Sequence, residues 1–314
     1  MTMAERVDEV LRAGAAPGFH GLVVMRGGEV ELERYGAGVD SRVGQSLGHV
    51  TFDRDTLHDL RSVSKSVVGL LYGIALGDGL VPEVGAGLMA QFPEYPDLAG
   101  DSARAGITIE HALTMTLGLD WNEDAPYTSA ANSEIAMELA PDRHRFVLER
   151  PVVEEPGRRR VYCGGATALL GGIIARGTGR PLEEYAADAL FRPLGIGTFE
   201  WSKGDDGLAM AAAGVRLRPL DLAAIGRLVL DGGRDIVPAS WLDEMTRPRV
   251  AVGDGLDYGY HWYVGGGMLQ AMGNGGQQLV VVPGEQLVVA VTAGEYDRPA
   301  TSTAAVFDAI FKKH

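Results

Sequence analysis

Hydrophobic and polar residues alternate as in strands near the two ends of the chain and follow helical patterns between them. Residues 20–35 (HGLVVMRGGEVELERY) place an apolar run, a Gly-Gly pair and then alternating residues in succession, which predicts a β-hairpin. Residues 277–283 and 286–293 are two apolar runs separated by a Gly-Glu pair. They predict a second hairpin, with buried strands.

Helical patterns fill most of the chain between these hairpins. Residues 62–77 form a long apolar segment without strict alternation, which predicts a buried helix. Capping residues, proline positions and apolar spacing predict further helices over residues 108–116, 166–178, 181–191, about 219–230, and 301–313. Strands near both ends and helices in the middle indicate an α+β protein.

The same order of elements suggests how the chain is divided. A chain of 314 residues is long enough for about two domains or one large domain. We expect residues 1–60 and 210–314 to form a domain of sheet and helices, and residues 61–209 to form a helical domain inserted into it.

Composition and charge narrow the classes of partner. The chain carries 28 basic and 42 acidic residues, a formal net charge of −14, which disfavours binding to nucleic acid and to acidic membrane surfaces. The single cysteine, Cys163, excludes an intrachain disulfide and a zinc site built on several cysteines. No apolar run is long enough for a membrane span, and the first residues lack the apolar core of a signal peptide. We expect a cytoplasmic protein with no membrane or nucleic-acid partner.

One serine–lysine pair stands at the start of the apolar segment 62–77. Lys65 is one of only four lysines, and Ser62 lies three residues before it, so the two side chains share a helix face. Serine is a weak nucleophile that needs an adjacent base. Burial in an apolar helix is expected to lower the pKa of Lys65, so that its neutral amine accepts the Ser62 proton. The alternative is structural: Ser62 as a helix cap and Lys65 as a side chain reaching solvent.

Four segments in order resemble the serine β-lactamase and penicillin-binding-protein superfamily, which is marked by S-x-x-K. They are residues 56–75 (TLHDLRSVSKSVVGLLYGIA), 107–124 (ITIEHALTMTLGLDWNED), 156–196 and 273–291. The resemblance is strongest to the class C-like branch, which holds esterases, D-aminopeptidases and 6-aminohexanoate-dimer hydrolases. It implies a β-lactamase/transpeptidase-like fold, in which helices flank an antiparallel sheet and the active site lies beside an inserted helical domain.

The resemblance assigns a role to Tyr162 in the sequence Tyr-Cys-Gly. In the superfamily this tyrosine faces the serine–lysine pair and relays a proton to the leaving group. The role suits a phenol whose pKa is depressed beside an ammonium; the alternative is a half-buried core tyrosine. Gly164 stands where asparagine is common, so an amide that could orient the substrate or Lys65 is missing. Trp121 is expected to shape the wall of the cleft.

The third motif of the superfamily aligns with Gly273, Asn274 and Gly275. Its usual cation is missing, which argues against efficient β-lactam hydrolysis and for a neutral ester or amide. We expect these residues to contact the substrate along a strand edge. The resemblance also implies that the backbone N–H groups of Ser62 and Gly276 form an oxyanion hole.

The sequence therefore predicts a serine hydrolase for a small ester or amide, with Ser62, Lys65 and Tyr162 as catalytic residues. It needs no metal or cofactor, and the chain is expected to be a monomer or homodimer. Two alternatives remain open: a true β-lactamase or D,D-peptidase, and a catalytically silent relative that serves as a binding module.

Overall fold

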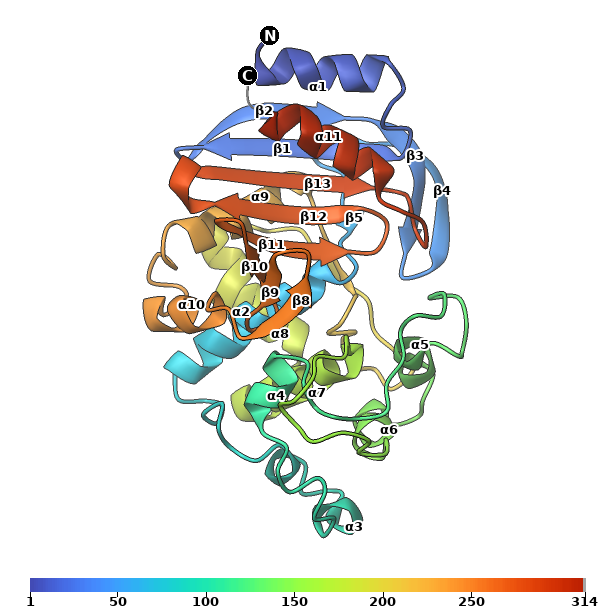
Figure 1. Ribbon diagram of the computed structural model, residues 1–314, viewed down its shortest axis with the longest axis vertical. Coiled ribbons are helices and arrows are strands. Elements are labelled where there is room, and N and C mark those ends of the chain that lie inside the picture. The colour runs from blue at the N-terminus through green and yellow to red at the C-terminus, as the bar shows by residue number, and fades with distance from the viewer. Residues whose placement is uncertain (313–314) are drawn as a thin grey trace.

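The computed structural model describes residues 1–312 and contains one large antiparallel sheet with helices on both faces (Figure 1). The first and last parts of the chain meet in this sheet, because β1 pairs with β13. In sheet order the strands are β2 (Glu29–Tyr35), β1 (Phe19–Arg26), β13 (Leu287–Ala293), β12 (Gln277–Val282), β11 (Met268–Gly273), β10 (Tyr263–Gly265), β9 (Leu256–Tyr258) and β8 (Val250–Gly253). Both predicted hairpins are confirmed, as is the α+β class.

Two hydrophobic cores lie on opposite faces of the sheet. The terminal helices α1 (Met3–Arg12) and α11 (Thr301–Phe311) pack on each other over one face. Helix α9 (Pro219–Leu230) packs against β1, β12 and β13 on the other face. The two terminal helices lie close together at the top of Figure 1.

The larger core continues from α9 into the helical part of the molecule. Its helices are α2 (Val63–Gly77), α3 (Pro96–Ala99), α4 (Ile109–Leu113), α5 (Ser133–Glu138), α6 (Arg143–Leu148), α7 (Gly164–Thr178), α8 (Leu182–Ala186) and α10 (Ala239–Met245). Helix α2 packs between α7 and the strands β11 and β12, and almost all of its residues are buried. The apolar segment at 62–77 is thus the central helix, as its pattern predicts.

Two small sheets connect these layers. The hairpin of β3 (Ala37–Arg42) and β4 (Gln45–Thr51) projects beside the large sheet. Strands β5 (His58–Asp59), β7 (Val215–Leu217) and β6 (Glu200–Trp201) form the other small sheet. Because β5 ends three residues before Ser62, this sheet fixes where the central helix begins.

Two predicted helices differ from the observed ones. The helix predicted over 108–116 ends at Leu113, because Met115 adopts a left-handed backbone conformation with φ of 58°. The helix predicted over 181–191 is regular only to Ala186 and continues as one wider π-helical turn over Ala187–Phe191.

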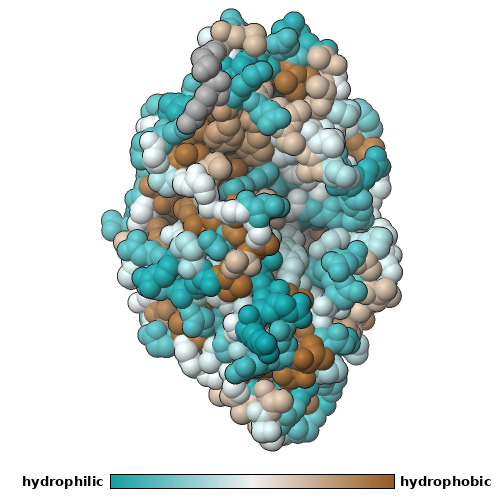
Figure 2. Space-filling model, in the orientation of Figure 1, coloured by the Kyte–Doolittle hydropathy of each residue, from teal (hydrophilic) through white to brown (hydrophobic). Residues whose placement is uncertain are grey.

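Hydrophobic residues on the molecular surface occur in small groups separated by hydrophilic ones on the face shown in Figure 2. No helix among residues 1–312 is both long and apolar enough to span a membrane.

Candidate active site

Ser62 follows a sharp turn that is held by a buried carboxylate. Arg61 adopts a left-handed backbone conformation, with φ of 48°. Asp59 stabilises it twice: one carboxylate oxygen accepts the N–H of Arg61 at 3.0 Å, and the other lies 3.0 Å from its guanidinium. A left-handed non-glycine residue costs about 1–3 kcal/mol unless its surroundings hold it. The turn places Ser62 at the start of α2.

Lys65 is 1% exposed, and its ammonium contacts three oxygen atoms. The Nζ atom donates to Ser62 Oγ, Glu134 Oε2 and the carbonyl oxygen of Ala212, each at 3.0 Å. Burial is the largest single influence and would lower the pKa of Lys65, but the charge of Glu134 and the weaker contributions of the other acidic groups around Nζ together outweigh it and raise this pKa well above its usual value. The expectation of a lowered pKa is wrong, because the sequence pattern did not reveal the buried carboxylate.

Glu134 is the residue of this site that the sequence did not point to. It lies on α5, is 3% exposed, and forms a buried ion pair with Lys65. Asn132 caps the helix: its Oδ1 accepts the N–H groups of Glu134 and Ile135, and its Nδ2 donates to the carbonyl of Ala125. An Asn two residues before Glu is common at helix starts, so only the lack of another partner for the buried Lys65 signals a nearby acid.

Tyr162 faces Lys65, as the resemblance implies. The Lys65 Nζ lies 4.9 Å from the centre of the Tyr162 ring, and the Arg160 guanidinium lies 5.4 Å from it. Burial raises the pKa of Tyr162 above its usual value, although the charge of Lys65 opposes this. The expected depressed pKa is therefore wrong, and Tyr162 carries its proton at neutral pH.

Gly164 begins α7 beside the ion pair. A Cβ atom at this position would lie 2.0 Å from Glu134 Oε2, so the carboxylate of Glu134 occupies the space that a side chain would need. The N–H of Gly164 donates to Glu123 Oε1 at 2.5 Å. The structure thus places Gly164 against two carboxylates, which explains the glycine where asparagine is common.

Trp121 and Glu123 lie at the wall of a cavity of about 400 Å³ next to Tyr162. The indole Nε1 of Trp121 donates to Glu123 Oε1 at 2.6 Å, and the hydroxyl of Tyr127 donates to Glu123 Oε2 at 2.8 Å. Burial, and secondarily the charge of Glu134, raises the pKa of Glu123 to about 7. The cavity is lined by Leu119, Asp120, Trp121, Asn122, Glu123, Asp124, Val153, Arg159, Val161 and Tyr162.

The third-motif residues lie in and just beyond the end of β11, on different sides of the turn into β12. A Cβ atom on Gly273 would lie 2.5 Å from the carbonyl oxygen of Leu60 and 3.1 Å from the backbone nitrogen of Ser62. Gly273 therefore borders the nucleophile. A Cβ atom on Gly276 would instead point toward Thr303 and Ala293.

The two residues between them face the loop after β13. The amide of Asn274 exchanges two hydrogen bonds with Asp297, at 2.6 and 2.8 Å. A Cβ atom on Gly275 would contact the ring of Tyr296. The structure thus places Gly273 against Ser62. The side chain of Asn274 instead bonds to Asp297, and the Cα of Gly275 packs on the ring of Tyr296.

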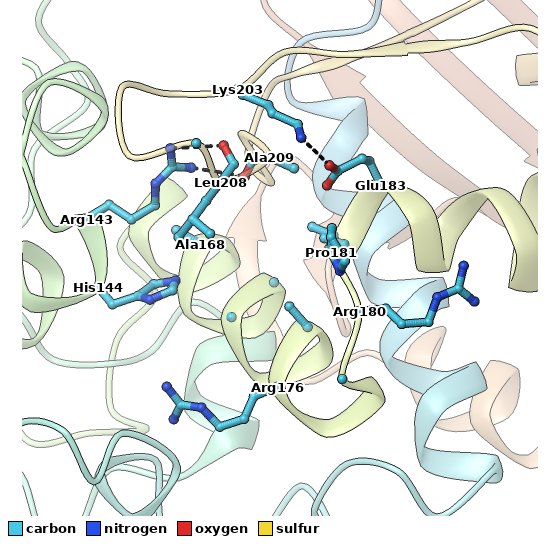
Figure 3. Close-up of a pocket in the computed structure, with 16 residues that line it drawn as sticks. Arg143, His144, Ala168, Arg176, Arg180, Pro181, Glu183, Lys203, Leu208 and Ala209 are labelled. Atoms are coloured by element: carbon cyan, nitrogen blue, oxygen red, sulfur yellow. Dashed lines mark hydrogen bonds and ion pairs between the residues drawn. The ribbon is translucent and has the colours of Figure 1, made fainter.

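A larger cavity, of about 540 Å³, lies elsewhere (Figure 3). Small residues of α7 form one wall, and Arg143, Arg176, Arg180 and Lys203 surround it. Each of these cations has an acidic partner, such as Glu183 for Lys203 at 2.6 Å. Neither Ser62 nor Tyr162 lines this cavity, so volume alone does not identify the site.

An antiparallel sheet, a buried central helix that begins with S-x-x-K and a tyrosine facing that pair define the β-lactamase and penicillin-binding-protein fold. The Beta-lactamase family model matches residues 3–307, and the chain belongs to this family of hydrolases. The resemblance predicted from the four segments is confirmed.

Individual relatives agree with this assignment. The chain is 28% identical over 238 residues to a 6-aminohexanoate-dimer hydrolase from Paenarthrobacter ureafaciens, a match that covers 71% of this chain and 56% of that protein's length. EstCE1, described as a hydrolase with promiscuous acyltransferase activity, superposes with a TM-score of 0.80 at 17% identity, over 98% of each chain. A penicillin-binding protein from Bacillus halodurans superposes with a TM-score of 0.74 at 15% identity, over 97% of this chain and all of that one. At such low identity, the two structural matches show the fold alone.

Proposed function

We propose that the protein cleaves a carboxylic ester or amide through an acyl-enzyme on Ser62. The observation that carries this proposal is the contact of Ser62 Oγ with Lys65 Nζ at 3.0 Å, beside the ring of Tyr162. A hydroxyl nucleophile with an adjacent proton carrier is the arrangement that covalent catalysis requires.

The reaction would proceed in two stages. Ser62 Oγ attacks the carbonyl carbon and its proton passes to Lys65 as the ammonium gives up one of its own protons to a neighbouring acceptor, while Tyr162 supplies a proton to the departing alcohol or amine. Water then attacks the acyl-enzyme by the reverse route. The backbone N–H groups of Ser62 and Gly276 would donate to the forming oxyanion, as the resemblance implies.

The residues around the site favour a substrate without a carboxylate next to the scissile bond. Gly273 and Asn274 supply no cation where relatives that recognise β-lactams have one. Asp120, Glu123 and Asp124 also line the cavity beside Tyr162 against one cation, Arg159, so acidic groups outnumber basic ones there and disfavour an anionic group. The relative named for 6-aminohexanoate dimer makes a linear amide with a free amine a natural member of the substrate panel.

The test is hydrolysis of p-nitrophenyl acetate, p-nitrophenyl butyrate, nitrocefin and 6-aminohexanoate dimer by wild type and three variants. We expect S62A to lose all turnover and labelling by a fluorophosphonate probe. We expect K65A and Y162F to lose about 10²-fold or more in kcat/KM, the usual scale for removing an acid–base group. Slow nitrocefin turnover beside measurable ester or amide turnover supports the proposal.

Other outcomes would favour the alternatives. Rapid nitrocefin turnover would identify a β-lactamase or D,D-peptidase, and the missing third-motif cation would then matter less than argued. No turnover and no acyl-enzyme by mass spectrometry would indicate a catalytically silent binding module.

A further inference from the structure

We propose that Glu134 is the positioning residue through which Lys65 becomes able to accept the Ser62 proton, and that Gly164 is a glycine because this carboxylate occupies its side-chain space. The inference rests on the proposed function. It adds a fourth side chain to the serine, lysine and tyrosine that the sequence pattern identifies.

The coordination of Lys65 supports this role. An ammonium has three N–H donors, and the three oxygens around Nζ, at 3.0 Å each, use all of them. Two of these oxygens, Ser62 Oγ and the Ala212 carbonyl, are uncharged in the resting enzyme. A fully buried ammonium is costly without a counter-charge. Glu134 is the only carboxylate among residues 1–312 that lies within ion-pair distance of Lys65.

The protons of Ser62 and Lys65 need an acceptor in the attack step, and Glu134 can supply it. Because the pKa of Lys65 is raised, its nitrogen has no lone pair available in the resting state. The carboxylate of Glu134 can remove one ammonium proton as the Ser62 hydroxyl proton reaches Nζ, so that Lys65 ends as an ammonium and Glu134 as a neutral acid. The bond from Ser62 Oγ to the carbonyl carbon forms in this step. When the leaving group departs, the proton on Glu134 returns through Lys65 and Tyr162, so the net transfer is from Ser62 to the leaving group.

The neighbouring titratable groups do not offer the same path. Tyr162 faces Lys65, but its raised pKa leaves it protonated. Glu123 and Tyr127 bond to each other, and Glu123 also accepts hydrogen bonds from Trp121 and the Gly164 backbone. Glu138, on the far end of α5, pairs with Arg143. Glu134 alone bonds directly to the lysine that bonds to the nucleophile.

The packing of Gly164 against Glu134 supports the second part of the proposal. A side chain at position 164 and the Glu134 carboxylate would compete for the same space, because a Cβ atom there would lie 2.0 Å from Oε2 and 2.7 Å from Cδ of Glu134. Gly164 is the first residue of α7 and has no need of glycine for its backbone, because its φ is not in the left-handed region. The glycine is therefore explained by the carboxylate beside it.

The first experiment compares E134Q with wild type and with E138Q, which neutralises a buried carboxylate on the same helix without touching Lys65. We expect E134Q to lower kcat/KM for a p-nitrophenyl ester by about 10²-fold with little change in KM, and E138Q to remain close to wild type. Without the carboxylate, burial lowers the pKa of Lys65, so the activity left in E134Q should rise with pH into the alkaline range. Wild-type activity should lack this alkaline rise, because the pKa of its Lys65 is raised well above the usual value.

The pH profile separates this role from a structural one. The titratable groups that face Glu134 are Glu123, Tyr127, Tyr162, Lys65 and, on the same helix, Glu138, and they contribute to both profiles. A merely structural role would reduce E134Q activity by the same factor at every pH and leave the profile unchanged. That result, or wild-type kcat/KM in E134Q, would overturn the inference. If S62A is inactive while E134Q is unaffected, the proposed function stands and only the inference fails; if S62A remains active, both fail.

The second experiment is a double-mutant cycle, which tests whether a side chain at position 164 displaces the Glu134 carboxylate. G164A should lower kcat/KM in wild type, because the added methyl group displaces the carboxylate from Lys65. In an E134A background the same change should cost little, since the space is empty. Independent, additive losses would show that Gly164 and Glu134 act separately and would contradict the packing argument.

Discussion

Lys65 shows how burial and charge act in opposite directions on one side chain. Burial favours the neutral amine, while the Glu134 carboxylate at 3.0 Å favours the ammonium, and this carboxylate prevails only together with the weaker contributions of the other acidic groups around Nζ. The outcome changes the starting protonation state of the candidate mechanism. It turns the serine–lysine pair into a chain of three groups, Ser62, Lys65 and Glu134.

Cys163 provides a prediction at the same scale. It is buried at the start of α7, and burial raises the pKa of its thiol above the usual value. Because the thiolate is the reactive form, we expect Cys163 to react with a disulfide reagent such as DTNB only after unfolding. The measurement is the rate of DTNB reaction in buffer and in concentrated urea, with C163S as the blank. Rapid reaction of the native protein would show that the thiol is exposed and ionised.

At the scale of elements, the site depends on a helix too short to be stable by itself. Helix α5 has six residues, whereas isolated helices of fewer than about 12 residues are marginal in water. Asn132 Oδ1 accepts the N–H of Glu134 in the first turn of the helix, and its Nδ2 donates to the carbonyl oxygens of Glu123 and Ala125 in the preceding loop. The position of Glu134 is therefore set by a cap and a loop rather than by helix propensity.

We accordingly expect N132A to lower both stability and activity. Loss of the cap should reduce the free energy of unfolding by about 1–2 kcal/mol and should reduce kcat/KM further than the stability loss explains, because Glu134 is released from Lys65. The matched control is D142A, which removes the side-chain cap of α6. Urea unfolding and ester kinetics on both variants provide the check. Equal activity in the two variants would show that the cap of α5 has no special link to the site.

At the scale of the whole molecule, a pair of buried histidines connects the large sheet to the segment that ends at Ser62. His20 on β1 and His58 on β5 lie 2.8 Å apart through Nδ1 and Nε2. His58 Nδ1 is 2.9 Å from the carbonyl oxygen of Asp59, so it donates there and its Nε2 accepts from His20. Both rings are neutral at neutral pH, because burial lowers the pKa of each of them.

The pair predicts a loss of stability in acid. Burial lowers the pKa of His20 to about 4 and, with the charge of His20, that of His58 to about 3, against a usual value of 6.5. Between these values the unfolded chain binds more protons than the folded one, so the stability present above pH 6.5 should be lost as the pH falls toward 4. Glu123 opposes this trend between its ordinary pKa of 4.5 and its raised pKa of about 7, where ionisation destabilises the fold.

Urea unfolding of wild type and H20N as a function of pH isolates the histidine contribution. Asparagine keeps a donor near the Nδ1 position but does not titrate. We expect the difference in free energy of unfolding between the two proteins to change by about 1–3 kcal/mol in favour of H20N as the pH falls from 6.5 to 4. A gap that does not change with pH would show that His20 titrates normally in the folded protein.

The sequence by itself determined what local patterns encode. Gly-Gly and Gly-Glu turns between apolar runs specified both hairpins, and the apolar segment after Ser62 specified the central helix. The spacing of Ser62 and Lys65 placed the two on one helix face, which their 3.0 Å contact matches. These features depend on residues close together in the chain, so they can be read without knowing the fold.

Only the tertiary structure decided what depends on contacts between distant segments. Glu134 lies 69 residues after Lys65 in the chain, so no local pattern shows that its carboxylate reaches the ammonium, raises its pKa and excludes a side chain at Gly164. The turn after β11 likewise brings Gly273 against the backbone of Ser62, which lies more than 200 residues earlier in the chain. Short elements such as α5 and β8 to β10 exist because neighbouring segments pack on them. Local patterns thus identified the reacting pair, while the charges and packing around it came from the fold.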